Sequence, residues 1–258
     1  MMVALASAAG SPGVTTTCLG LTEAASRAEA TSRRTAICVE ADPVGGSAIL
    51  AGYFRGFESP GVTAVDLLLA SHDDDFTTTV DHALVPMGAG GFVLPGPRSH
   101  RQAASVIDLW PVLAAELAVR PATDVFVDLG RLGMASFAEA FVWAADAIAL
   151  VMRCDLPAIS AARQWADWLI ELRRSRPEMG PAGLIVIGPG RPYSAREIGR
   201  GLDLPVWASL GWYPAGAAVY AVGAQRRKKR LSSQYTAAAQ ALAQVAESRS
   251  QVLGAVHG

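Results

Sequence analysis

The sequence predicts an α/β protein with a mostly parallel sheet and helices on both faces. Short apolar runs alternate with longer segments of helical periodicity along the 258-residue chain, which is typical of βαβ units. Apolar residues make up 51% and charged residues 17% of the chain, a composition that favours a folded core over disorder. The longest apolar stretch, residues 134–152, contains Glu139 and Asp146, so it predicts a helix and a strand rather than a membrane span.

The first half of the chain begins with a clear strand–loop–helix unit. Val3–Ser7 is an apolar run that predicts a buried strand, and a glycine-containing loop separates it from a helical segment at about Thr15–Ala30. A second strand is expected at Thr35–Glu40 because the Asp-Pro and Gly-Gly pairs that follow it form turns. A short helix follows at Thr63–Ala70. In the polar stretch SHDDDFTTT we expect the acidic segment HDDDF to be a solvated loop, before a strand that ends in VLPGP.

The second half repeats the alternation of strand and helix. Periodic apolar positions predict helices at Gln102–Val119, Ala135–Trp143, Ala158–Arg174 and Ala195–Gly201. Continuous apolar runs predict strands at Asp124–Asp128, Ala147–Met152, Gly183–Ile187 and Val206–Leu210. There is no internal repeat and no clear domain boundary in this part of the sequence. We therefore expect one domain over residues 1–224.

Residues 225–258 have a different composition. Five consecutive cations, Arg226–Arg230, precede an Ala-rich segment that predicts a helix packed on the same domain. Its apolar face is expected to carry Tyr235, Ala238, Leu242 and Val245, and its cap to be Ser232 or Ser233. The cations either contact anionic lipid or DNA or form a solvated helix start. The net charge of −1 excludes a global attraction to polyanions.

The cysteines and histidines indicate neither a disulfide framework nor a metal centre. Three cysteines and four histidines are scattered without ligand spacing: Cys18, Cys38, Cys154, His72, His82, His100 and His257. A sparse, odd cysteine count fits a reducing compartment, and no basic region precedes the first apolar run as in a signal peptide. We expect a cytoplasmic protein.

The stretch AAGSPGVTTT, residues 8–17, lies between the first strand and the first helix. Gly10 and Gly13 allow close backbone approach, and the N–H groups of residues 13–16 could cradle phosphates at the helix start. Thr15 or Thr16 could place a hydroxyl on Mg²⁺, whereas Pro12 has no N–H to donate. The alternative is a tight turn without a ligand.

Three carboxylates end later strands, at the edge where ligands bind in open α/β sheets. Glu40 and Asp42 close the second strand, and Asp128 closes the strand DVFVD. Asp128 would hold Mg²⁺ as a Walker B aspartate does, or it is a structural cap. Asp42 either orients a water molecule or starts a turn before Pro43.

The order of these motifs resembles the ParA/MinD family of deviant Walker A ATPases along almost the whole chain, with the closest similarity to the atypical CpaE/TadZ branch. The resemblance implies a P-loop NTPase fold, ATP and Mg²⁺ as cofactors, and dimers that form across nucleotide. It assigns nucleotide binding to Gly10, Ser11, Gly13, Val14, Thr15, Thr16 and Arg191, metal binding to Thr15 and indirectly to Asp128, and catalysis to Asp42. Arg191 either stacks on the base or caps the next helix.

The chain departs from the family at both lysines of the phosphate loop. Ala9 falls at the signature lysine, which reaches the partner's nucleotide, and Val14 falls at the lysine that contacts the β- and γ-phosphates. Losing such a charge typically costs a few kcal/mol of transition-state stabilisation, or about 10²–10³ in rate. Weak binding without fast turnover is therefore expected. Arg131 either substitutes for the lost charge or is a solvent-facing loop residue.

The resemblance leads to three functional hypotheses. The favoured one is a positioning or scaffold protein that recruits a pilus, secretion, conjugation or partitioning apparatus through a protein partner. Such a protein would be cytoplasmic or peripheral at the inner face of the membrane, and could be a homodimer. The second is an active Mg-ATPase that uses Arg131, and the third is an amide ligase, for which the sequence offers no second substrate motif.

Overall fold

The computed structural model describes residues 1–28, 34–88, 90–226 and 230–256, without the side chains of residues 252–256. Its strands are β1 (Met2–Ser7), β2 (Thr35–Glu40), β3 (Val85–Pro86), β4 (Phe92–Leu94), β5 (Thr123–Arg131), β6 (Ala147–Arg153), β7 (Ala182–Ile187) and β8 (Val206–Leu210). They form one sheet in the order β3-β4-β2-β5-β1-β6-β7-β8, and only the β3–β4 pair is antiparallel among the described strands. The predicted mostly parallel α/β architecture is confirmed.

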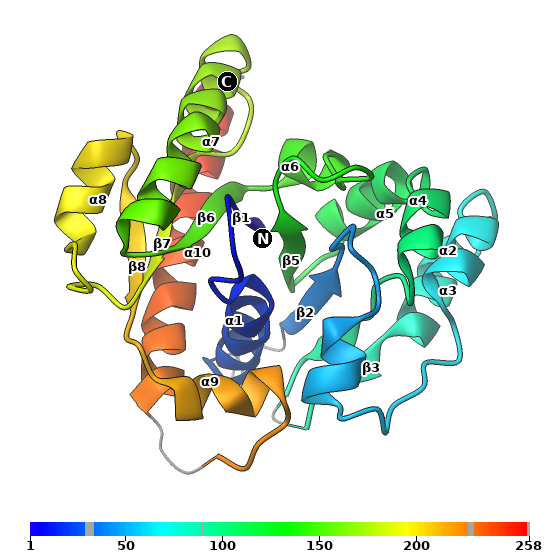
Figure 1. The fold of residues 1–258 in the computed structure, drawn as a ribbon. Coiled ribbons are helices and arrows are strands. Elements are labelled where there is room, and N and C mark those ends of the chain that lie inside the picture. The colour runs from blue at the N-terminus through cyan, green and yellow to red at the C-terminus, as the bar shows by residue number, and fades with distance from the viewer. Residues whose placement is uncertain (29–33, 89, 227–229, 257–258) are drawn as a thin grey trace.

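Helices cover both faces of this sheet (Figure 1). They are α1 (Val14–Ala28), the π-helical turn η1 (Ile49–Tyr53), α2 (Ala64–Ala70), α3 (Phe76–Ala83), α4 (His100–Ser105), α5 (Leu109–Ala118), α6 (Ala140–Ala144), α7 (Leu156–Ser175), α8 (Ala195–Leu202), α9 (Pro214–Ala221) and α10 (Arg230–Val256). Along β1, Val3 and Leu5 pack in the core beneath α1 and α10, whereas Ala4 and Ala6 pack in the core on the opposite face. A fully buried central strand therefore separates two apolar layers.

The C-terminal helix α10 packs along α1 and β8. Tyr235, Ala238 and Leu242 are buried as predicted, and a Cβ atom on Gly20 of α1 would overlap the Tyr235 ring. Glycine at position 20 thus lets the two helices approach closely. The predicted cap is wrong, because Ser232 and Ser233 lie inside a helix that begins at Arg230.

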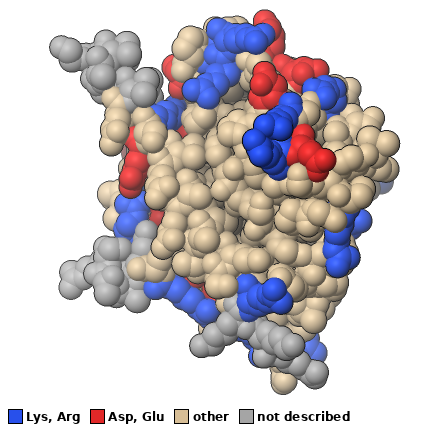
Figure 2. All heavy atoms as spheres, turned by 90° about the vertical axis from the view of Figure 1, so that its left-hand side faces the viewer, with Lys and Arg blue, Asp and Glu red and all other residues tan. Residues whose placement is uncertain are grey.

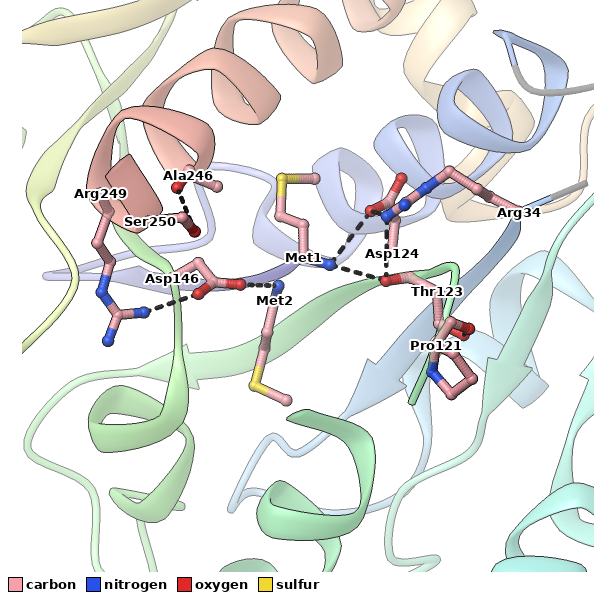
Figure 3. Close-up of polar contacts among 10 residues, drawn as sticks. All are labelled: Met1, Met2, Arg34, Pro121, Thr123, Asp124, Asp146, Ala246, Arg249 and Ser250. Atoms are coloured by element: carbon pink, nitrogen blue, oxygen red, sulfur yellow. Dashed lines mark hydrogen bonds and ion pairs between the residues drawn. The ribbon is translucent and has the colours of Figure 1, made fainter. Parts of the chain in front are cut away.

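Charged side chains fasten α10 at the amino ends of the central strands (Figure 3). The Arg249 guanidinium contacts Asp146 Oδ1 at 2.7 Å, and Asp146 Oδ2 accepts the Met2 N–H at 2.8 Å. Arg34 forms a second ion pair, with Asp124, at 2.6 Å. These contacts hold the edge of the sheet opposite to the carboxyl ends of the parallel strands.

Several helical predictions need correction. The acidic segment predicted as a solvated loop is exposed at residues 72–75, and the unpredicted helix α3 begins directly after it, because Phe76, Val80 and Ala83 form a buried stripe at helical spacing. The helix predicted at Gln102–Val119 is two helices, since a turn at Val106–Asp108 separates α4 from α5.

The predicted helix at Ala135–Trp143 is only α6, because Ser136 has a φ of +61°, a left-handed conformation that breaks a helix. The helix predicted to reach Ala30 is described as far as Ala28, and Ala30 lies outside the described residues. The segments η1, β3 and α9 were not predicted. No helix in the described part of the chain is long and apolar enough to span a bilayer.

Candidate functional site

The glycine-containing loop between β1 and α1 lies at the centre of the sheet's carboxyl edge, because β1 is flanked by β5 and β6. Gly10 and Gly13 have φ angles of +65° and +105°, which disfavour any residue with a side chain. Thr17 fixes the start of α1, since its N–H and its hydroxyl both donate to the Gly13 carbonyl, at 2.9 Å and 2.8 Å. The N–H groups of the preceding turn have no acceptor within the helix and are available to an anion.

Val14, which the resemblance aligns with the phosphate-loop lysine, has a largely buried side chain. Only 6% of it is exposed, and it packs in the core cluster that contains Leu19 and Cys18. It also borders the cavity beside the loop. The backbone of Val14 can therefore serve an anion site, but its side chain contributes packing instead of charge.

A cavity of about 540 Å³ opens beside this loop. Its walls are formed by the loop and α1 start (Ser7, Gly10, Ser11, Pro12, Gly13, Val14, Thr15, Thr16), the segment after β2 (Asp42, Val44) and the end of β5 with the residues that follow (Asp128, Gly130, Arg131, Met134). The structure thus brings together every predicted site residue except Arg191. The arrangement combines helix N–H groups, hydroxyls, two carboxylates and one guanidinium around a single space.

Asp128 is the most deeply buried charged group of this cavity, with 0% exposure. Its Oδ1 accepts the Gly130 N–H at 2.9 Å, while its Oδ2 is buried and accepts no hydrogen bond of ordinary geometry within the described residues. Burial raises the pKa of Asp128 to about 7, against the opposing effects of the Thr15 hydroxyl and the Gly130 N–H. The nearby carboxylates of Asp42 and Glu40 raise the pKa further.

These features fit a divalent cation. A buried carboxylate oxygen that accepts no hydrogen bond of ordinary geometry has room for a further partner, and a carboxylate beside a hydroxyl supplies the oxygen ligands that Mg²⁺ prefers. Among the described residues, no group of three His, Cys, Asp or Glu side chains is placed to hold a metal ion. A magnesium ion here would therefore depend on Thr15, Asp128, water and the oxygens of a bound phosphate. Of the four histidines considered in the sequence, His257 lies outside the described residues.

Asp42 and Glu40, two residues apart in the sequence, have different surroundings. Asp42 borders the cavity, and its Oδ1 accepts the Val44 N–H at 2.9 Å, which is the predicted turn contact. Its carboxyl group lies against Gly130, where a Cβ atom would overlap it. Asp42 is thus held beside the end of β5, next to Asp128.

Glu40 is 4% exposed and does not border the cavity. Its Oε2 accepts the Ser47 hydroxyl at 2.5 Å and the Gly96 N–H at 3.0 Å, and its Oε1 accepts the Ile49 N–H at 3.1 Å. Burial raises the pKa of Glu40, and these three hydrogen bonds oppose the rise. Glu40 therefore joins β2 to η1 and to the segment after β4 rather than facing a ligand.

The two predicted arginines lie in different places. Arg131 is exposed at the rim of the loop cavity, with its guanidinium 3.3 Å from Met134 Sδ. Arg191 is exposed in a neighbouring hollow of about 260 Å³, which no residue of the loop borders and which Arg153 and Trp212 also line. Sequence reasoning missed these last two residues. The only local signal was a cation at the end of an apolar strand, at Arg153.

The basic segment Arg226–Arg230 is partly engaged in internal contacts. Arg226 forms an ion pair with Glu23, a residue of α1 that is 1% exposed, at 2.7 Å. The Arg230 guanidinium lies 4.9 Å from the centre of the Tyr213 ring. Residues 227–229 lie outside the described residues. On the face shown in Figure 2, the basic side chains of the described residues are dispersed, and several lie beside acidic ones.

Comparisons with known proteins identify solved structures of similar fold, but no close relative in sequence. No protein-family model matches the chain, and no curated protein matches it. Among solved structures, a ParA family ATPase from Chlorobium tepidum is 14% identical with a TM-score of 0.76, covering 93% of this chain and 97% of its own. The septum site-determining protein MinD from Pyrococcus horikoshii, solved with Mg-ADP, is 17% identical with a TM-score of 0.67, covering 98% and 97%.

A structure of different function is also similar. Cobyrinic acid a,c-diamide synthase from Mycobacterium smegmatis, solved with ADP and magnesium, is 19% identical with a TM-score of 0.62, covering 85% of this chain and 89% of its own. The predicted ParA/MinD-like P-loop fold is therefore confirmed. The fold is shared by a septum site-determining protein and by a diamide synthase, so it does not by itself select a function.

Proposed function

We propose that this chain is a ParA/MinD-like positioning or scaffold protein, of the CpaE/TadZ kind, with a nucleotide site that lacks both lysines. The observation that carries the proposal is the single cavity that joins the loop, Thr15, Asp42 and Asp128, while the Val14 side chain lies in the core. The protein would bind ATP and Mg²⁺ weakly and hydrolyse ATP slowly or not at all. It would recruit or localise a pilus, secretion, conjugation or partitioning apparatus.

Each residue of the cavity has a role in this proposal. The N–H groups at the start of α1, from Gly13 to Thr16, would bind phosphate oxygens. Thr15 and Asp128 would hold Mg²⁺, which supplies positive charge beside the phosphates. Asp42 would orient a water molecule. Without a lysine, the transition state loses electrostatic stabilisation worth typically a few kcal/mol, which favours binding without fast turnover.

Loss of the signature lysine also bears on self-association. The Ala9 side chain is too short to reach a nucleotide bound in a partner subunit. A homodimer of this chain would therefore form without a contact between this loop position and the partner's nucleotide. The proposed output is therefore binding to a partner protein rather than a cycle driven by hydrolysis. Contact of Arg226–Arg230 with anionic lipid or DNA would be weak, because Arg226 already neutralises Glu23.

Titration calorimetry with ATP, in the presence of Mg²⁺ or EDTA, tests the proposal. We expect measurable Mg²⁺-dependent binding to the native protein, loss of most of it in Thr15→Ala, and no change in Thr78→Ala, which alters an exposed threonine of α3. Absence of binding to the native protein would refute the nucleotide site. An ATPase rate typical of lysine-containing family members would refute the proposed impairment.

The alternative of an active ATPase is supported by Arg131, whose guanidinium borders the same cavity. In that case Arg131→Gln and Asp42→Ala would each abolish the measured ATPase rate. A rate that neither substitution changes would instead come from a contaminating ATPase. The amide-ligase alternative rests on similarity to the diamide synthase alone. It requires ATP-dependent product formation from a panel of carboxylic acids.

A further inference from the structure

The phosphate loop has an arginine on each side. Because β1 lies between β5 and β6, the residues that end those two strands flank the loop. Arg131 ends β5 and borders the 540 Å³ cavity, on the side of the carboxylates. Arg153 ends β6, as the first exposed residue after six buried ones, and it lies on the opposite side.

Arg153 borders a second cavity at the loop. This cavity, of about 340 Å³, is lined by Ser11, Gly13 and Thr16 of the loop and by apolar residues of the β8–α9 connection, α9 and α10. Thr16 and Gly13 border both cavities, so the start of α1 separates two spaces that meet at the same backbone N–H groups. Within the described residues, Arg153 is the only charged side chain of the 340 Å³ cavity.

The Arg153 side chain is held in place without being neutralised. Its guanidinium carbon lies 5.1 Å from the centre of the Trp212 ring, a stacking distance for a cation–π contact. No carboxylate lies within ion-pair distance of it in the described part of the chain. Stacking uses the face of the guanidinium and leaves its N–H edge free to donate, in the bidentate geometry that suits phosphate.

We propose, on the basis of the proposed nucleotide site, that Arg153 held on Trp212 is a phosphate-binding residue that supplies the positive charge absent from Val14. The charge comes from the β6 side of the loop, and it acts on the phosphate group bound at the N–H groups of Gly13 and Thr16. Trp212 is a positioning residue, because it orients the guanidinium. The site therefore recognises the phosphate chain through a stacked arginine on a neighbouring strand instead of a lysine on the loop.

Calorimetry with three probes tests this assignment: Mg-ATP, Mg-pyrophosphate and adenosine. Arg153→Gln should lower the affinity for Mg-ATP and for Mg-pyrophosphate about tenfold or more, which is the usual effect of removing a charge-assisted hydrogen bond. The affinity for adenosine should not change. Arg153→Lys should recover part of the loss. Trp212→Leu should lower the affinity for pyrophosphate by a smaller factor. Because pyrophosphate has no base, this loss could not come from a contact between Trp212 and a base. Arg173→Gln, at an exposed arginine of α7, is the matched control and should bind like the native protein.

The outcomes separate the two proposals. Unchanged pyrophosphate and ATP binding in Arg153→Gln would overturn the role of Arg153 and leave the nucleotide site intact. Loss of adenosine binding together with ATP would assign Arg153 to the base instead, which also overturns it. If the native protein binds neither ATP nor pyrophosphate, the nucleotide site and the role of Arg153 both fail. Arg153 is exposed, so these variants should fold, and thermal unfolding checks this.

Discussion

The buried carboxylate of Asp128 makes the stability of the protein depend on pH in a defined direction. Burial raises its folded-state pKa to about 7 from an ordinary value of 3.8, so between these values the folded protein holds a proton that the unfolded chain releases. Stability contributed by this group is present below pH 4 and is lost as the pH rises to 7. Asp128→Asn removes the ionisation, and it should therefore stabilise the metal-free protein above pH 7.

The magnitude follows from the shift in pKa. A rise of about three units corresponds to about 4 kcal/mol at neutral pH and above, at 1.4 kcal/mol per unit, which is a ceiling. We expect Asp128→Asn to increase the free energy of unfolding by about 2–4 kcal/mol at pH 8 and to have almost no effect at pH 4. The asparagine can still accept the Gly130 N–H, so that contact is preserved.

Urea unfolding at pH 4, 6 and 8 in EDTA measures this difference directly. Asp203→Asn, an exposed αL residue that ends α8, controls for the change from carboxylate to amide. A difference between Asp128→Asn and native protein that stays constant with pH would refute the reasoning. Adding Mg²⁺ and ATP should narrow the difference at pH 8, because only the native protein then gains stability from the ligand.

Three further changes test the packing around the loop. Val14→Lys should raise ATP affinity at least tenfold in calorimetry while lowering the free energy of unfolding by about 1–3 kcal/mol, through lost burial; Val14→Met should change neither quantity by as much. Arg226→Ala removes one partner of the buried Glu23 and leaves its other partner, Arg27, in place. Urea unfolding should therefore show a loss of about 1.5–3 kcal/mol, whereas an effect below about 0.5 kcal/mol would contradict a buried ion pair. Gly20→Ala should lower stability by about 1–3 kcal/mol because it forces the Tyr235 ring aside; combining it with Tyr235→Leu should recover part of the loss.

Strands and the central loop could be predicted because their signals are local. β2, β6 and β7 are largely apolar runs, and nearly all of their residues are buried on both faces of the sheet. The loop could be placed because Gly10 and Gly13 lie directly between an apolar strand and a periodic helix. The order of later carboxylates then located Asp42 and Asp128, and the structure brings both to one cavity with Thr15.

The remainder depends on contacts between distant segments. Glu40 has the same local pattern as Asp42, and its role follows from hydrogen bonds to Ser47, Ile49 and Gly96, the last of which lies 56 residues away. The stacked pair Arg153 and Trp212 comes from the ends of two strands separated by β7. The short helix α9 has apolar residues all round, PAGAAVYA, so no 3.6-residue period marked it.

The three hydrogen bonds of Glu40 also set how fast the site responds to a ligand. They anchor the segment that carries Asp42 at β2, at η1 and at the strand β4 that pairs beside it. The amide protons of Ile49 and Gly96 should therefore exchange with deuterium much more slowly than those of the exposed loop residues around them. A segment fixed at both ends has no large closure to complete after ligand arrival. Association with nucleotide should accordingly follow a single exponential in stopped-flow experiments, with a rate that increases linearly with ligand concentration.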